Sequence, residues 1–168
     1  RRSVFTMGKI GVLWELVEVP DGEHRLELRA RGKGQVRLYG VVMEREGPGI
    51  VYDSLGIVGA RGKRLLNADP EHMSRQIAHR NPDLLVLAFG GNEAGERHMK
   101  MTYYEQVLRE VIRFMRKGNE EMPCLLFSPL DQGERNERGR IKTIPIIPRI
   151  VAAQRKVALA EGCAFFDA

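Results

Sequence analysis

The sequence is poor in cysteine, and this limits the classes of protein to which it can belong. Only Cys124 and Cys163 occur among 168 residues, too few for a disulfide framework, and their spacing fits no metal site. Each begins an apolar run, so each is expected to be a small buried hydrophobic residue. The cysteines therefore do not indicate whether the protein resides in an oxidising or a reducing compartment.

Long apolar runs and targeting signals are also lacking. No apolar run approaches the roughly 20 residues that a membrane-spanning helix needs, so no span is predicted. The first residues lack the apolar core and the small-residue cleavage site of a signal peptide. Hydrophobic residues make up 43% of the chain and charged residues 29%, which is typical of a globular protein.

Histidine is scarce, and the four that occur form no recognisable site. His72 and His79 are seven residues apart on one predicted helix, whereas a helical zinc site uses a four-residue spacing. His24 and His98 lie in polar surroundings without a partner for catalysis. The sequence therefore predicts four surface histidines, no metal and no cofactor.

The net charge of +5 raises the question of nucleic-acid binding. The 27 basic residues are interleaved with 22 acidic ones, and the densest basic stretches, residues 29–37 and 59–66, contain no aromatic side chains that could stack on bases. These charges are expected to be solvated surface, and no nucleic-acid partner is predicted.

Residues 1–46 have the pattern of antiparallel β-structure. Residues 24–30 alternate strictly, with Leu26 and Leu28 on one face and charged side chains on the other. Turn-forming residues separate three such segments, which is typical of a β-sandwich. Three strands are too few to bury both sheets of a sandwich. Their partners are expected either upstream of Arg1 or in the second part of the chain.

From residue 47 onward, strands and helices alternate, which predicts a second domain over residues 47–168 with a parallel sheet and helices on both faces. Apolar runs predict a central strand over residues 84–89 and further strands over 124–128 and 163–168. Residues 131–143 are expected to be a polar loop. The predicted helices are a short one after glycines 56, 59 and 62, one capped by Asp69 and ending before Asn81, one starting at a capping box of Thr102 and Glu105, and one over residues 144–161.

The most informative stretch is LLVLAFGGNEAG, residues 84–95, in which a buried strand runs into two glycines, an asparagine and a glutamate. Gly90 and Gly91 allow a sharp backbone turn. The Asn92 amide can donate a hydrogen bond to a carbonyl oxygen that gains negative charge during acyl transfer. Glu93 could support it. The alternative is an ordinary turn, in which glycine and asparagine are also favoured.

Residues 52–60, YDSLGIVGA, form a second candidate site, because backbone N–H groups between a strand and a helix suit an oxyanion. Asp53 and Ser54 echo a GDSL motif, but Tyr52 stands where its glycine belongs. No histidine motif follows to activate the hydroxyl, so a turn or supporting role is expected for both residues. Asp167 ends a predicted strand and would need a histidine as its partner.

Residues 82–94 resemble the asparagine-bearing block of SGNH (GDSL-like) esterases, with Glu93 in place of the usual aspartate. Residues 49–60 resemble the glycine-bearing block, and the resemblance implies that Gly59 is a backbone donor to the oxyanion. Residues 151–168 are similar to the helix and strand before the family's final Asp-x-x-His block. Residues 1–46 look like the end of a jelly-roll domain, such as the one inserted in peptidoglycan O-acetylesterases.

The resemblance implies a three-layer, flavodoxin-like fold and a serine esterase acting on a carbohydrate ester. It also implies that the serine and the Asp-x-x-His block lie outside residues 1–168. These residues would then supply Asn92 and Gly59 to the oxyanion hole, with Glu93, Ser54 and Asp53 as supporting candidates. A periplasmic or secreted location is expected on the same ground. The alternatives are a non-catalytic carbohydrate-binding protein with a degenerate hydrolase fold, and a nucleotide-binding α/β domain, whose glycine-rich fingerprints are not matched.

Overall fold

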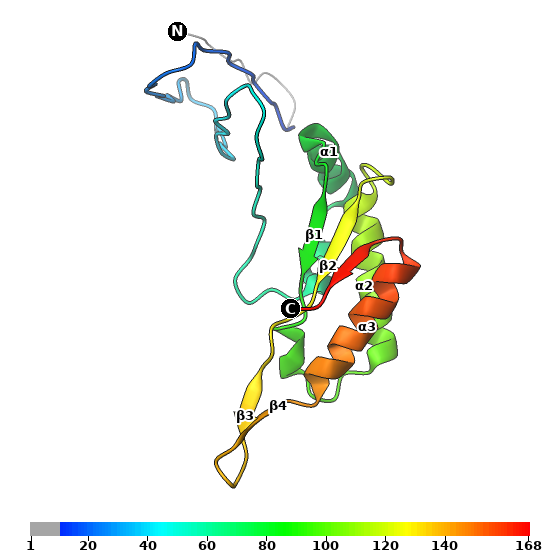
Figure 1. Cartoon of the computed structure of the whole chain (residues 1–168). Helices are drawn as coiled ribbons and strands as arrows, with labels where there is room; N and C mark the ends of the chain where they lie inside the picture. The colour runs from blue at the N-terminus through cyan, green and yellow to red at the C-terminus, as the bar shows by residue number, and fades with distance from the viewer. Residues whose placement is uncertain (1–10) are drawn as a thin grey trace. The chain divides into compact units, whose positions relative to one another are not determined.

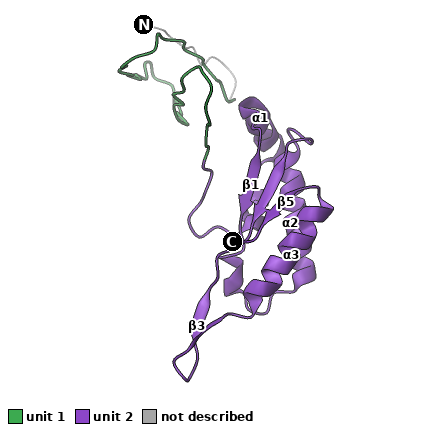
Figure 2. Ribbon diagram, viewed as in Figure 1, with its two compact units in different colours: residues 1–53 green, residues 54–168 purple. Residues whose placement is uncertain are grey.

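A computed structural model describes residues 11–168 of the chain (Figure 1). The chain divides into two compact units, Arg1–Asp53 and Ser54–Ala168 (Figure 2). Each unit is described by itself.

The described part of the first unit, residues 11–53, contains neither helix nor strand. Leu26 and Leu28, which were expected to face a sandwich interior, are each 56% exposed. A physical reason is that a few strands with one apolar face are stable only when a second layer covers that face. The start of the first expected strand lies outside the described residues. A sandwich domain over residues 1–46 therefore stays a prediction.

The second unit is built on a parallel sheet of three strands: β1 (Leu85–Ala88), β2 (Cys124–Phe127) and β5 (Ala164–Phe166). Leu85 is paired with Cys124, and Leu125 with Ala164, both in parallel register. This confirms the prediction that the three apolar runs are neighbouring parallel strands. It corrects one detail, because β2 is the middle strand and β1 lies at an edge of the described sheet.

Helix α1 (Pro70–Arg80) begins as the sequence predicts. The Asp69 side chain accepts a hydrogen bond of 2.6 Å from the backbone N–H of His72, and proline occupies the first turn. The helix ends at Asn81, whose φ of 43° is left-handed. A short 3-10 helix, η1 (Gly62–Asn67), precedes α1. Ile77 provides the buried contact of α1 with the core.

Helix α2 (Met101–Arg116) is strongly amphipathic and contributes a buried stripe that includes Leu108, Val111 and Ile112. The predicted capping box is wrong. The N-cap is Lys100, without a side-chain cap, and Glu105 instead bonds the Lys156 Nζ at 2.7 Å. Its partner lies on helix α3 (Ile146–Ala160), so a tertiary ion pair replaces the local bond.

The region expected to be a polar loop contains a β-hairpin. Strand β3 (Gly133–Arg135) pairs antiparallel with β4 (Ile141–Thr143). The six residues of these strands are all exposed, so no apolar alternation marked them as strands. The hairpin projects away from the sheet in Figure 1.

The helices α2 and α3 pack together against one face of the sheet (Figure 1). Leu87, Cys124 and Leu126 project into that face and are buried. The chain runs from β1 to β2 to β5 in one direction, and right-handed crossovers then place every connecting helix on the same side. On the other face, Val86 is 46% and Phe166 50% exposed. A parallel sheet with connecting helices is the α/β architecture that the sequence predicted, and it is consistent with the expected flavodoxin-like fold.

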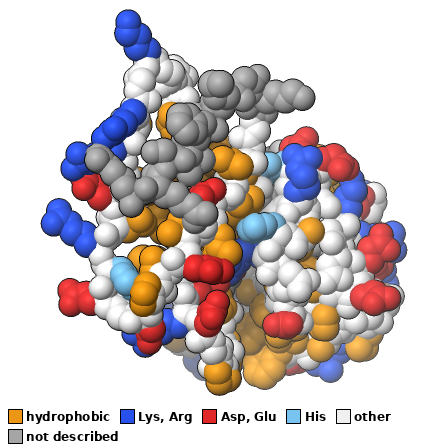
Figure 3. All heavy atoms as spheres, turned by 90° about the horizontal axis from the view of Figure 1, so that it is seen from above, with side chains coloured by type: hydrophobic (Ala, Val, Ile, Leu, Met, Phe, Trp, Pro, Cys, Tyr) orange, Lys and Arg blue, Asp and Glu red, His pale blue; other side chains and the backbone are white. Residues whose placement is uncertain are grey.

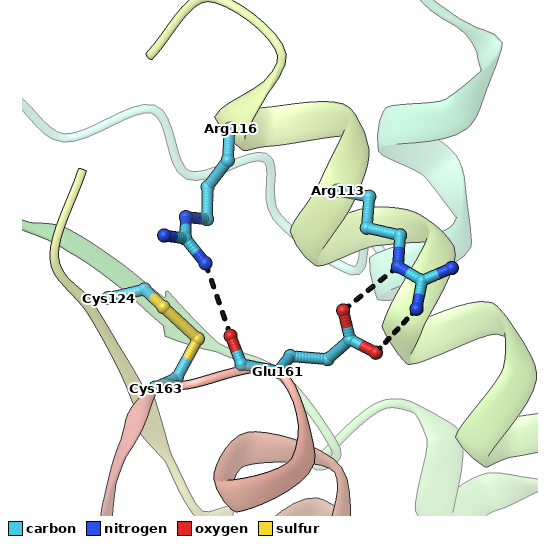
Figure 4. The surroundings of a disulfide bond; sticks show 5 residues. All are labelled: Arg113, Arg116, Cys124, Glu161 and Cys163. Atoms are coloured by element: carbon cyan, nitrogen blue, oxygen red, sulfur yellow. Dashed lines mark hydrogen bonds and ion pairs between the residues drawn. A yellow bond between two sulfur atoms is a disulfide. The ribbon is translucent and has the colours of Figure 1, made fainter. Parts of the chain in front are cut away.

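The two cysteines form a disulfide, which corrects the expectation that each is a free buried residue. Cys124 begins β2 and Cys163 immediately precedes β5, and their Cα atoms are 4.7 Å apart. The parallel register brings them side by side, although 39 residues separate them in the sequence. Figure 4 shows that this bond lies beside Glu161, at the end of α3, and Arg116, at the end of α2.

Candidate active site

The candidate site lies where the parallel strands end in loops, which is where open α/β sheets place their ligands. Strand β1 leads into residues 89–92 and the short 3-10 helix η2 (Glu93–Gly95). Strand β2 leads into a loop in which Gln132 donates a hydrogen bond of 3.0 Å from Nε2 to the carbonyl of Gly91. Side chains in neighbouring loops therefore fix the backbone that follows β1.

Gly90 makes the sharp turn after β1 possible. Its φ is 115°, which a residue with a side chain rarely adopts. A Cβ at this position would lie 3.0 Å from atoms of Ile150 and Pro129. Glycine is therefore required here both by conformation and by space, as the sequence predicted for the turn.

Asn92 lies in the loop and reaches the segment before η1. Its Nδ2 donates a hydrogen bond of 2.9 Å to the carbonyl oxygen of Ala60. Ala60 closes a turn with Ile57 at 3.0 Å, and Gly59 occupies this turn with a φ of 74°. The two residues that the sequence singled out therefore come from neighbouring loops. The bond to Ala60 uses one of the two hydrogens of the Asn92 amide.

The Gly59 N–H has no acceptor among the described residues. Gly59 and Ala60 also line a groove of about 780 Å³ between η1 and α2, to which Tyr103 and Gln106 contribute. A backbone donor at the rim of a groove is open to a ligand. Whether it serves an oxyanion stays a prediction.

Glu93 is buried, with 6% of its surface exposed, and both of its carboxylate oxygens are used. Oε1 accepts a hydrogen bond of 2.7 Å from the backbone N–H of Gly62. Oε2 accepts one of 2.9 Å from the backbone N–H of Gly90. The sequence predicted only that Glu93 could support Asn92, and the structure gives this residue defined partners.

A second buried polar residue, Gln154 on α3, was missed by the sequence analysis. Its Nε2 donates hydrogen bonds of 2.8 Å to the carbonyl of Phe89 and 2.9 Å to the Tyr104 hydroxyl. Burial raises the pKa of the Tyr104 hydroxyl well above its ordinary range, and the negative charge of Glu93 raises it further. Tyr104 is therefore neutral at physiological pH. The available signal was a glutamine among the apolar positions of a helix.

The other candidate residues take no part in the hydrogen bonds described above. Ser54 is exposed in a segment without helix or strand, and Asp53 ends the first unit. Asp167, after β5, is bonded to the Arg155 Nη2 at 2.6 Å. No hydrogen bond joins Ser54 or Asp167 to a histidine in the described part of the chain.

Within residues 11–168, no group of three or more histidine, cysteine, aspartate or glutamate side chains could hold a metal ion. No helix among these residues is long and apolar enough to cross a membrane. On the face shown in Figure 3, basic and acidic side chains are interspersed.

Comparisons with known proteins bear on the family and the fold. Residues 22–168 match the model of the GDSL-like lipase/acylhydrolase family, so the chain belongs to that family. The match begins inside the segment for which sandwich strands were predicted. No curated protein matches the sequence. A solved structure of a peptidoglycan O-acetylesterase is similar in fold, with a TM-score of 0.56 and 20% identity, covering 65% of this chain and 31% of that chain. The present chain thus corresponds to under a third of that protein.

Proposed function

We propose that the full-length protein is a serine esterase that removes O-acetyl groups from a carbohydrate. Membership of the GDSL-like lipase/acylhydrolase family supports hydrolysis of an ester. The observation that carries the proposal is the hydrogen bond between Asn92 and Ala60, which holds the Asn92 amide beside the turn containing Gly59. Two donors from neighbouring loops then lie near one place where a developing negative charge could sit.

The proposed mechanism is acyl transfer through a serine ester. A serine hydroxyl attacks the ester carbonyl, a histidine accepts the hydroxyl proton, and an aspartate orients that histidine. The carbonyl oxygen becomes negative in the tetrahedral intermediate. The Asn92 amide and the Gly59 N–H donate to this oxygen. The intermediate collapses to acetyl-serine as the bond to the sugar oxygen breaks, and the histidine gives its proton to that oxygen. Water then attacks the acetyl-serine in a second, equivalent step and releases acetate and the free serine. The serine and the Asp-x-x-His block are assigned to parts of the protein outside residues 1–168.

A carbohydrate substrate is supported by the likeness to a peptidoglycan O-acetylesterase. The groove beside Gly59 offers room for part of a sugar chain next to the donors. We also propose a periplasmic or secreted location. The disulfide between Cys124 and Cys163 supports it, because such bonds persist in oxidising compartments.

The experiment is Asn92→Ala in the full-length protein, assayed on a chromogenic acetyl ester and on an acetylated carbohydrate. Loss of one oxyanion donor lowers kcat by about 10²–10³-fold. The bond to Ala60 is also lost, so unfolding free energy should fall by about 0.5–1.5 kcal/mol, measured by thermal or chemical unfolding. That loss leaves a folded enzyme.

Asn119→Ala is the matched control. Asn119 lies in the turn between α2 and β2, at the other end of the sheet, and its side chain has no hydrogen bond among the described residues. Turnover should be unchanged in this variant. Normal turnover in folded Asn92→Ala would refute the role of Asn92. A wild type that is folded but inactive on both esters would instead favour the alternative of a carbohydrate-binding protein.

A further inference from the structure

We infer that Glu93 is the positioning residue of this site. Its single carboxylate ties together the two loops that carry the proposed oxyanion donors. The catalytic consequence rests on the proposed function, whereas the structural role of the carboxylate does not.

Each carboxylate oxygen serves one loop. Gly62, bonded to Oε1, lies three residues after Gly59, and Gly90, bonded to Oε2, lies two residues before Asn92. Together with the bond from Asn92 to Ala60, this carboxylate therefore sets the distance between the two donors, and it is the buried one of the two links. Gln132 and Gln154 also bond the backbone after β1, but neither reaches the Gly59 segment.

Because the Glu93 carboxylate is buried, it depends on both of these hydrogen bonds. No cation forms an ion pair with Glu93 within the described residues, so its charge is balanced by backbone N–H groups. A buried carboxylate that lost one of these bonds would keep an unsatisfied oxygen, which is costly. Loss of either hydrogen bond is therefore expected to affect the positions of both loops.

The length of the side chain is part of the argument. Aspartate, the usual residue in the family block that this segment resembles, is shorter by one C–C bond of about 1.5 Å. It would keep the charge and lose the reach to one loop. Glutamine would keep the reach, but its NH2 group would face one of the two N–H groups.

Glu96 provides a matched control, because it connects the same two segments at the surface. Its Oε2 accepts a hydrogen bond of 2.7 Å from Arg61, which precedes η1, and Glu96 itself follows η2. The side chains of Arg61 and Glu96 are 35% and 47% exposed. Exposed pairs contribute little, so Glu96→Gln should leave the loops in place.

The experiment combines two measurements on the full-length protein. The two hydrogen bonds by which Glu93 holds both loops are called the clamp. Hydrogen exchange of the Gly62 and Gly90 amides, followed by NMR on protein labelled at glycine, reports directly whether these bonds are present. Kinetics on an acetyl ester report its consequence. In Glu93→Gln and Glu93→Asp, at least one of these amides should exchange tenfold faster or more. The kcat should fall by about 10²-fold, as expected for donors misplaced by about 1 Å.

The change should be confined to kcat, with KM altered less than about threefold, because oxyanion donors act in the transition state. Recovery of kcat by Glu93→Asp would overturn the clamp, since charge alone would then suffice. Unchanged exchange at both glycines in both variants would also overturn it. If Glu93→Gln fails to fold, Glu93→Asp decides by the same two measurements. If the wild type cleaves no ester, the proposed function fails, and the exchange rates alone decide the clamp.

Discussion

The two ends of the parallel sheet are held by different kinds of interaction. At the amino ends of the strands, the Cys124–Cys163 disulfide joins β2 to the start of β5. Beside it, Arg113 on α2 forms two hydrogen bonds of 2.8 and 2.9 Å with the Glu161 carboxylate (Figure 4). At the carboxyl ends, Glu93 accepts hydrogen bonds from the backbone of its own loop and of a neighbouring one, and Asn92 donates to the backbone of that neighbouring loop.

The interactions at the amino end therefore stabilise the fold, whereas those at the carboxyl end position groups of the loops. The amino end joins secondary-structure elements to one another, and the hydrogen bond with Glu161 raises the pKa of Arg113. The carboxyl end fixes individual N–H and C=O groups of loops, which is what a site for a developing charge requires. We therefore expect changes at the amino end to act on unfolding, and changes at the carboxyl end to act on turnover.

The largest effect on stability is expected from removing the disulfide. The double substitution Cys124→Ala and Cys163→Ala should lower the free energy of unfolding by about 2–5 kcal/mol, measured by chemical denaturation at neutral pH. Turnover of the folded protein should stay within about twofold, because the bond lies at the end opposite to Asn92. A reductant should destabilise the wild type to a similar extent and leave the variant unchanged.

A loss of turnover without loss of stability in this double variant would remove the distinction between the two ends. The same conclusion would follow if both thiols of the wild type reacted with an alkylating agent before reduction, because the disulfide would then be absent.

Gly90→Ala tests the carboxyl end. The added Cβ would meet Ile150 and Pro129 at 3.0 Å, with a φ of 115° that alanine rarely adopts. The strain should cost about 1–3 kcal/mol of unfolding free energy. It should also displace the N–H that Glu93 accepts. Turnover should therefore fall more than the loss of folded protein explains, measured by kcat corrected for the folded fraction.

Gly95→Ala is the control for this change. No atom lies within 4 Å of a Cβ at Gly95, although it is only five residues away. Its stability should change by less than about 0.5 kcal/mol. Equal effects at the two glycines would mean that the close approach to Ile150 and Pro129 does not constrain the loop.

The sequence predicts the frame of the second unit well, because local signals suffice there. Apolar runs mark β1, β2 and β5, and Asp69 with Pro70 marks the start of α1. Of the site, the pattern predicted the Gly90 turn and singled out Asn92, while the resemblance singled out Gly59. The structure brings Asn92 and Gly59 onto neighbouring loops, and their roles stay predictions.

The features that the sequence missed depend on contacts between distant residues. The disulfide needs the register of β2 with β5, and the partners of Glu93 need η1 to lie beside the end of β1. The β3–β4 hairpin is exposed and carries no alternating pattern. The capping box failed because α2 begins at Met101, before Thr102, and Glu105 bonds Lys156 on another helix.

The smallest effect is expected at the Glu105–Lys156 pair, which joins α2 to α3 between the two ends of the sheet. The hydrogen bond from Lys156 holds the pKa of Glu105 below its ordinary value of 4.5. A carboxylate with a lowered pKa in the folded state stabilises the protein above its unfolded pKa, and this contribution is lost as pH falls through the folded pKa. Glu105→Gln should therefore lower the unfolding free energy at neutral pH by less than about 1 kcal/mol. The difference from wild type should shrink as pH falls below about 4.5, followed by urea denaturation at several pH values. Lys156→Met should give a smaller difference with the same pH dependence, because Glu105 still pairs with Arg109 at 3.5 Å. A constant difference across this pH range would show that the pair contributes by packing and not by charge.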